Sequence, residues 1–155
     1  MTDIKLDFEP GSTALGISIL ANDLESDEGL RTAFMLSLFC DRAAEPTDVL
    51  PEGVTSRRGW WADAVARVVG DKFGSRLWQL QREKETPSVL IRAQDYASES
   101  LQWSIDDKIV ERLGVEVEFI RPQRGYLITT AVYRPRRDPV KFKFNRLWVA
   151  EAARI

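Results

Sequence analysis

Residues 115–145 read VEVEFIRPQRGYLITTAVYRPRRDPVKFKFN, and their pattern decides the fold class. Apolar residues alternate with glutamates over 115–119 and with polar residues over 140–145, and residues 126–134 are mainly apolar. A period of two predicts strands, and the Pro-Gln-Arg-Gly segment at 122–125 predicts a turn. Three consecutive strands with short connections predict an antiparallel meander.

A long helix is predicted immediately before these strands, from Thr86 to Gly114. Thr86 can cap it, Pro87 suits its first turn, and Gly114 suits the position after its last turn. Between them one apolar stripe recurs at threes and fours, made by Leu90, Ala93, Ala97, Leu101, Ile105, Ile109 and Leu113. The expected fold is therefore α+β, with the long helix packed on the C-terminal meander.

The preceding residues of the body predict a buried strand, a long loop and one or two short helices. The dense apolar run 30–40 reads as a strand, and residues 41–56, with two prolines and a glycine, read as a loop. Residues 60–69 and 76–84 can form short helices, the second capped by Ser75.

The N-terminal residues 1–29 are rich in Asp, Glu, Gly and Ser and have no sustained period. They predict an extended or partly irregular arm with a short strand near 17–20. We expect one domain over residues 1–155, composed of this arm and a helix-sheet body over 30–155.

Composition limits the possible functions. With 155 residues, 44% hydrophobic and 30% charged, the chain is suited to a single soluble domain. Its apolar runs are shorter than the roughly 20 residues that cross a membrane, and no signal pattern begins it, so we expect no membrane partner. Cys40 is the only cysteine and histidine is absent, which excludes an intrachain disulfide, a Ser-His-Asp triad and histidine-ligated metals. We expect no cofactor and no metal.

Charge is unevenly distributed along the chain. Residues 1–56 hold eleven acidic and three basic side chains, whereas residues 57–155 hold thirteen acidic and nineteen basic. The basic excess, which includes Arg134, Arg136 and Arg137, raises a nucleic-acid-binding module as an alternative. Alternating lysines on a strand equally fit a solvated or protein-facing sheet surface, so nucleic acid is the weaker interpretation.

Two apparent motifs fail when their spacing is tested. Residues 23–29 resemble the start of a calcium loop, but Phe34 stands where a bidentate Glu is needed. Asp106 and Asp107 could suggest a carboxylate pair for glycoside cleavage, yet adjacent helical residues point apart. Neither segment supports catalysis or metal binding.

Three of the five tryptophans, Trp60, Trp61 and Trp78, fall within 19 consecutive residues. Such a cluster marks either a local core or an anchor for a partner, because each indole combines a large apolar ring with an N–H that needs an acceptor. Burial in a local core is favoured by physical chemistry alone.

The same segments carry a specific resemblance. Together with the strings at 29–33, 38–42 and 50–51, the marking positions are Arg58, Gly59, Trp60, Trp61, Asp63, Gly74, Ser75, Arg76, Leu77, Trp78, Arg82, Glu83 and Lys84. In their order and spacing they resemble the Mu-type phage baseplate protein family, and the similarity continues through Trp103.

The resemblance implies a small structural protein of contractile tails, found in phages, prophages and phage-derived bacteriocins. The layout is similar to that of the wider wedge and sheath-initiator proteins, some of which are labelled lysozyme-like. That group often has Glu-Pro-Arg after the helix tryptophan, whereas Ser104-Ile105-Asp106 follows Trp103 here. Contacts of that triplet therefore cannot be transferred.

The resemblance further implies a non-enzymatic subunit that binds other baseplate and tail proteins (wedge, spike or hub, and sheath or tube) in several copies. It would be made in the host bacterial cytoplasm and located in the virion tail baseplate. The alternatives are a peptidoglycan-cleaving tail enzyme and the nucleic-acid-binding module. The candidate partner interface is Trp103, Lys141, Phe142, Lys143 and Phe144.

Overall fold

The computed structural model divides the chain into two units, Met1–Leu36 and Ser37–Ile155. It describes residues 3–4, 6–8, 15–17, 19–20, 23–24, 26–27, 29–65, 72–121, 125–136 and 138–147. The single-domain organisation stays a prediction, and each unit is described by itself.

The first unit contains more strand than we predicted. Among its described residues, short strands form three antiparallel pairs: β1 (Asp3–Ile4) with β6 (Ser26–Asp27), β2 (Leu6–Phe8) with β3 (Leu15–Ile17), and β4 (Ile19–Leu20) with β5 (Asp23–Leu24). The strand predicted near residues 17–20 overlaps β3 and β4, whereas the other short strands were not predicted. Strands of two or three residues are too short to show an alternating period, so pattern reading misses them.

The apolar run 30–40 is a helix, α1 (Leu30–Phe39), where we predicted a buried strand. Gly29 has φ +79°, and its carbonyl accepts the Ala33 N–H at 2.9 Å as the helix begins. Leu, Ala, Met and Phe dominate the run, and Thr32 is its one β-branched residue, so intrinsic preference favours a helix. A continuous apolar run shows no period, so the sequence pattern alone does not distinguish a buried strand from a buried helix.

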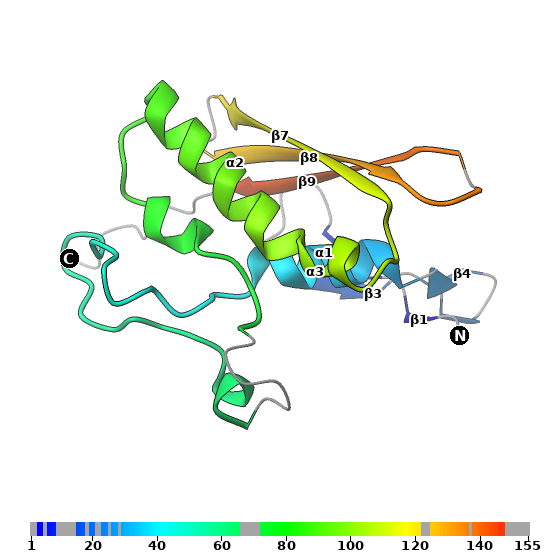
Figure 1. Ribbon diagram of the computed structural model, residues 1–155, viewed down its shortest axis with the longest axis horizontal. Helices are drawn as coiled ribbons and strands as arrows, with labels where there is room; N and C mark the ends of the chain where they lie inside the picture. The colour runs from blue at the N-terminus through cyan, green and yellow to red at the C-terminus, as the bar shows by residue number, and fades with distance from the viewer. Residues whose placement is uncertain are drawn as a thin grey trace. The chain divides into compact units, whose positions relative to one another are not determined.

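The predicted C-terminal meander is confirmed in the second unit (Figure 1). Its strands are β7 (Arg112–Ile120), β8 (Gly125–Tyr133) and β9 (Val140–Leu147). They pair antiparallel in the order β7-β8-β9. Val117 lies opposite Ile128, which lies opposite Phe144, and all three are buried on one face of the sheet.

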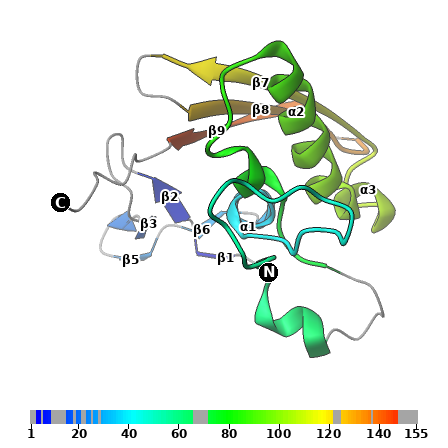
Figure 2. The same ribbon diagram turned by 90° about the vertical axis from the view of Figure 1, so that its left-hand side faces the viewer.

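The long helix α2 (Pro87–Leu101) covers that face, so the α+β class is confirmed (Figures 1 and 2). Pro87 occupies its first turn as predicted, with Thr86 at the N-cap. Its buried residues Val89, Ala93, Ala97 and Leu101 recur at fours and pack the helix onto the sheet.

The helix ends earlier than its apolar stripe. After α2 a single turn forms α3 (Trp103–Asp106), and Lys108 then adopts φ +58°. The N–H groups of Ile109 and Val110 donate to the Ser104 carbonyl at 3.0 and 2.9 Å, which closes the helix end. Ile109 is consequently 44% exposed. The predicted C′ position at Gly114 was wrong, because that glycine lies inside β7.

The two short helices are 3-10 turns, η1 (Trp61–Val65) and η2 (Leu77–Leu80). The rest of the helix predicted over 60–69 lies outside the described residues. Arg76 occupies the N-cap position of η2 without a side-chain cap, whereas the predicted cap Ser75 lies one residue earlier and its Oγ accepts the Leu77 N–H at 3.4 Å. Residues 41–56 form the predicted loop, with turns and one bridging residue, Asp41. None of the described helices combines the length and the apolar character needed to cross a membrane.

Candidate functional site

Backbone hydrogen bonds join three of the motif strings in the second unit. The Ser75 N–H donates to the Cys40 carbonyl at 2.9 Å, and the Arg42 N–H donates to the Ser75 carbonyl at 3.0 Å. The Ala44 N–H donates to the Arg57 carbonyl at 2.9 Å. We call this assembly the motif hub: residues 40–48, 57–59, 74–79 and Glu99.

Two motif glycines are required by the close approach of these segments. Gly74 has φ +97°, and a Cβ there would lie 2.5 Å from the Cys40 carbonyl oxygen. Gly59 has φ +111°, and its Cβ would meet the Ala43 side chain at 3.0 Å. Both conformations are rare for other residues. These glycines therefore serve the geometry of the hub.

Trp78 is the buried centre of the hub. Its side chain is 1% exposed, and its indole N–H donates to the Arg42 carbonyl at 2.8 Å. The Arg58 guanidinium lies over the indole, 4.6 Å from the ring centroid, and pairs with Asp41 at 2.6 Å. The neighbouring Leu77 is also buried. For Trp78 the local-core interpretation is confirmed.

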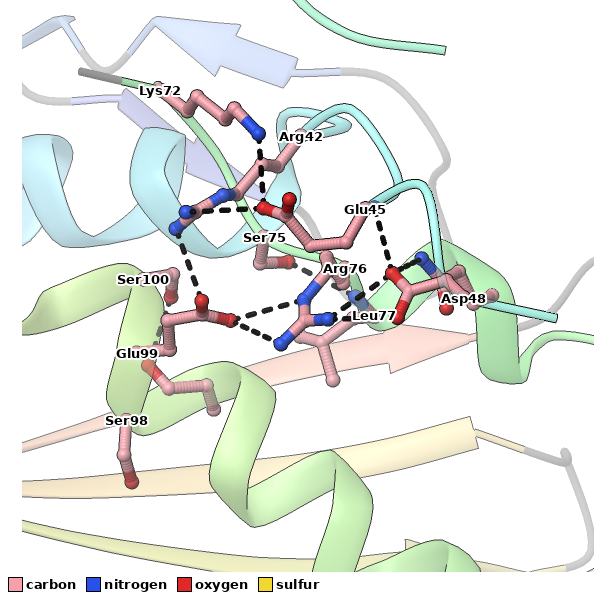
Figure 3. Close-up of polar contacts among 12 residues, drawn as sticks. Arg42, Glu45, Asp48, Lys72, Ser75, Arg76, Leu77, Ser98, Glu99 and Ser100 are labelled. Carbon is pink, nitrogen blue, oxygen red and sulfur yellow. Dashed lines mark hydrogen bonds and ion pairs between the residues drawn. The ribbon is translucent and has the colours of Figure 1, made fainter. Parts of the chain in front are cut away.

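Arg76 links the loop to the long helix (Figure 3). It contacts Asp48 at 3.1 Å and Glu99 at 3.0 Å, and its guanidinium lies 4.5 Å from the centroid of the Tyr96 ring. Burial would lower the pKa of Arg76, but hydrogen bonds to Asp48 and Glu99 outweigh it, so this pKa is raised. Burial likewise would raise the pKa of Asp48, but hydrogen bonds from Gln79, the Glu45 N–H and Arg76 hold it below its ordinary value.

Glu45 continues the network on the other side of Arg42. Lys72 donates to its carboxylate at 2.9 Å and Arg42 lies 3.9 Å from it, while Arg42 also reaches Glu99 at 3.4 Å. The Lys72 hydrogen bond holds the pKa of Glu45 below its usual value, against the effect of burial. Glu45 and Asp48 therefore remain ionised at neutral pH and act as ion-pair partners within the hub.

The other two motif tryptophans project from the hub. Trp60 is 43% and Trp61 79% exposed, their ring centroids lie 5.8 Å apart, and Trp60 contacts Phe73 at 5.0 Å. The local-core interpretation was wrong for this pair, because both side chains are exposed and η1, which begins at Trp61, has no buried residue. The Phe73 N–H donates to Asp63 Oδ1 at 3.1 Å, which holds Phe73, and the Trp60 ring in contact with it, beside η1. We call Trp60, Trp61 and Phe73 the aromatic knob.

The last motif residues fasten the chain after η2. Arg82 donates to the Glu52 carbonyl at 2.8 Å, and Glu83 pairs with Arg92 of α2. Lys84 is exposed. This string therefore holds the loop 41–56 and the start of α2 to the turn between them.

The structure separates the residues of the candidate interface. Lys141 and Lys143 are exposed, whereas Phe144 on the opposite face of β9 is buried and packs edge-on to Phe39, with centroids 6.2 Å apart. Phe142 is half-buried beside it. Trp103 lies on α3, where its indole N–H donates to Ser37 Oγ at 3.0 Å. The two lysines are thus the open part of this set.

Sequence reasoning missed the acidic half of the hub. Asp48 is 28 residues and Glu99 23 residues from Arg76, and no spacing rule connects them. The available signal was the set of motif arginines, which need carboxylates once they are half-buried. Among the described residues no three acidic or cysteine side chains form a group that could hold a metal ion. The calcium-like segment 23–29 lies largely outside the described side chains.

A model of the family "Phage protein GP46" matches residues 30–139, which include the whole motif hub. The chain belongs to the GP46 family. Among the relatives, the baseplate protein gp46 of Escherichia phage Mu is 44% identical over 123 residues, covering 79% of this chain and 82% of the relative. The Mu-like prophage FluMu protein gp46 of Haemophilus influenzae is 36% identical over 128 residues, covering 83% of each chain. The predicted resemblance to the Mu-type phage baseplate protein family is thereby confirmed.

Proposed function

We propose that this chain is a non-enzymatic structural subunit of a phage tail baseplate. The observation that carries the proposal is its 44% identity, over most of both chains, to a protein named as a baseplate protein of phage Mu. Within the baseplate we assign it to the wedge, where it joins neighbouring wedge proteins to the tail tube or sheath. Its place of action is then the virion tail, after synthesis in the host bacterial cytoplasm.

The aromatic knob is the proposed attachment to a neighbouring wedge protein. Tryptophans are enriched among the residues that dominate binding energy at protein interfaces. Trp60 and Trp61 are exposed, yet the Gly59 turn and the Arg58–Asp41 ion pair fix the backbone that carries them. A fixed anchor loses little conformational freedom on binding. The fitting partner presents an apolar pocket with acceptors for the indole N–H groups.

The outer edge of β9 is the proposed second attachment. In the described part of the chain β9 pairs only with β8, so its other edge can add a strand from the sheath or tube. Backbone pairing supplies the strength of such a contact, and the alternation of Lys141, Phe142, Lys143 and Phe144 sets its register.

The charged groups of the hub favour a structural role. Asp48, Glu99, Arg42 and Arg76 neutralise one another within one network, which holds the loop on α2. Asp106, one of the two adjacent carboxylates rejected above as a glycoside-cleaving pair, accepts a hydrogen bond from Gln102 at 3.0 Å. These contacts have an evident use in holding the fold.

Binding to purified neighbouring tail proteins tests the knob. Trp60→Ala/Trp61→Ala is expected to weaken binding to a wedge neighbour at least about tenfold, because interface tryptophans commonly contribute about 2 kcal/mol or more. The matched control is Ile91→Ala, which removes another exposed apolar side chain, 62% exposed on α2. A host that carries the tail genes but lacks this one should assemble tails with the control and not with the double variant.

Two results would overturn the proposal. Intact tails in the absence of the gene would remove the structural role. Release of soluble fragments from purified cell walls by the isolated chain, retained in the Trp60→Ala/Trp61→Ala variant, would establish the enzymatic alternative instead.

A further inference from the structure

The face of the meander away from α2 carries its charges in two strips. Glu116 and Glu118 are exposed on β7, and Lys141 and Lys143 are exposed on β9. They alternate along their strands with the side chains packed beneath α2, so all four lie on the opposite face. Arg112, exposed on the same face at the start of β7, lies over the Tyr133 ring, 4.0 Å from its centroid. Beyond it, this face is acidic along β7 and basic along β9.

The central strand separates the strips with neutral residues. Thr129 lies opposite Glu116 on one side and opposite Lys143 on the other, so these two charges stand at the same height along the sheet. Two strand spacings, about 10 Å, separate β7 from β9. Within the described residues, none of the four charged side chains forms an ion pair. The charges therefore remain available to another molecule.

We propose that this face binds the same face of a second copy of the chain. If one sheet is turned over about an axis along β8, its β7 comes to lie above β9 of the other copy. Because Glu116 and Lys143 share one height, each Glu116 then faces Lys143 of the second copy, and Glu118 lies one diagonal step from the same lysine. Such an isologous contact repeats every attraction twice.

Charge complementarity selects this occupant. Turning the second sheet about the perpendicular axis would place glutamates above glutamates, so one orientation is strongly preferred. A uniformly acidic or basic partner would be attracted by one strip and repelled by the other. The half-buried Leu127, Thr129 and Ala131 in the middle allow two sheets to approach to about 10 Å. This pairing does not rest on the baseplate role.

Analytical ultracentrifugation of charge-reversal variants tests the pairing. Wild type is expected to dimerise at high protein concentration, with an association constant that falls as salt rises. Glu116→Lys/Glu118→Lys and Lys141→Glu/Lys143→Glu should each lower self-association about tenfold or more. An equimolar mixture of the two variants should form a heterodimer tighter than the wild-type dimer, because four lysines of one face then meet four glutamates of the other.

The control is Asp95→Lys/Asp107→Lys, which changes the net charge as much as Glu116→Lys/Glu118→Lys does. Its two exposed positions lie on α2 and just after α3. It should leave self-association within about twofold of wild type. If a lysine variant fails to fold, Glu116→Gln/Glu118→Gln replaces it. Pairing through the β9 edge would leave the Glu116 and Glu118 variants unaffected. That result, or a wild-type chain that stays monomeric up to its solubility limit, would overturn the proposal.

Discussion

The guanidinium of Arg58 lies 4.6 Å from the centroid of the Trp78 ring while it pairs with Asp41 at 2.6 Å. Arg58 adopts φ +53° to do so, a backbone conformation that arginine rarely takes. The two contacts offset that strain. This relationship joins the string that carries the exposed tryptophans to the buried one.

Replacement of Arg58 tests how much the contact stabilises. Arg58→Ala is expected to lower the free energy of unfolding by about 1–2 kcal/mol, through loss of a cation–π contact and an ion pair whose side chains are 34% and 32% exposed. Arg136→Ala is the matched control, because Arg136 has nearly the same φ, +57°, and is exposed. Urea unfolding of both variants measures the difference. Equal effects would mean that backbone strain, and not the Trp78 contact, governs this position.

Gly74 should tolerate no side chain. Gly74→Ala is expected to cost about 2–4 kcal/mol, because the chain must both hold a positive φ and move the Cys40 carbonyl. Gly114→Ala is the comparison, since its added Cβ would meet Ala131 at an ordinary 3.6 Å. Thermal unfolding should show a large loss for the first and a small change for the second. A mild Gly74→Ala would show that the hub can open without loss of stability.

Arg76 should depend on the shape of its side chain as well as on its charge. Arg76→Ala leaves Asp48 and Glu99 without their main partner and is expected to cost about 2–3 kcal/mol, less than a fully buried pair. Arg76→Lys restores the charge but not the fork that reaches both carboxylates and lies on Tyr96. We expect it to recover less than half of the loss. If Arg76→Lys recovered all of the lost stability, the charge of Arg76 alone would account for its contribution.

The lowered pKa values of Glu45 and Asp48 predict an acid-sensitive hub. The folded chain favours both carboxylates, so as pH falls the unfolded chain takes up protons first. The stabilisation is complete above the ordinary values of 4.5 and 3.8 and is lost as pH falls through the lower pKa values of the folded state. Urea unfolding as a function of pH measures this slope. Lys72→Met, which removes the main partner of Glu45, should flatten it, and an unchanged slope would contradict the assignment.

Two tryptophans of the same motif should contribute very differently to the stability of the fold. Trp78→Ala is expected to cost about 3–5 kcal/mol, because it leaves a cavity and an unpaired Arg42 carbonyl. Trp61→Ala should change stability by less than about 0.5 kcal/mol, since its side chain is largely in solvent. Chemical denaturation distinguishes them. A strongly destabilised Trp61→Ala would show that the knob belongs to the fold.

The alternation of apolar and polar residues accounts for most of the sheet prediction, because β7 and β9 are exposed on one face only. It failed where burial was continuous or an element was short. Residues 30–40 have no period to read, and the stripe after Leu101 persists although Lys108 breaks the helix. The sequence indicated the motif residues of the hub but not the ion pairs that join them, because Arg76, Asp48 and Glu99 meet only after the chain has folded.

The exposure of Trp61 has a spectroscopic consequence. An indole in water emits at longer wavelength than one in an apolar pocket, and we expect the emission of Trp78, which is already buried, to change little. Docking of the knob should therefore shift the emission of the chain to the blue without any attached dye. The free subunit carries its own fluorescent reporter of whether that contact has formed.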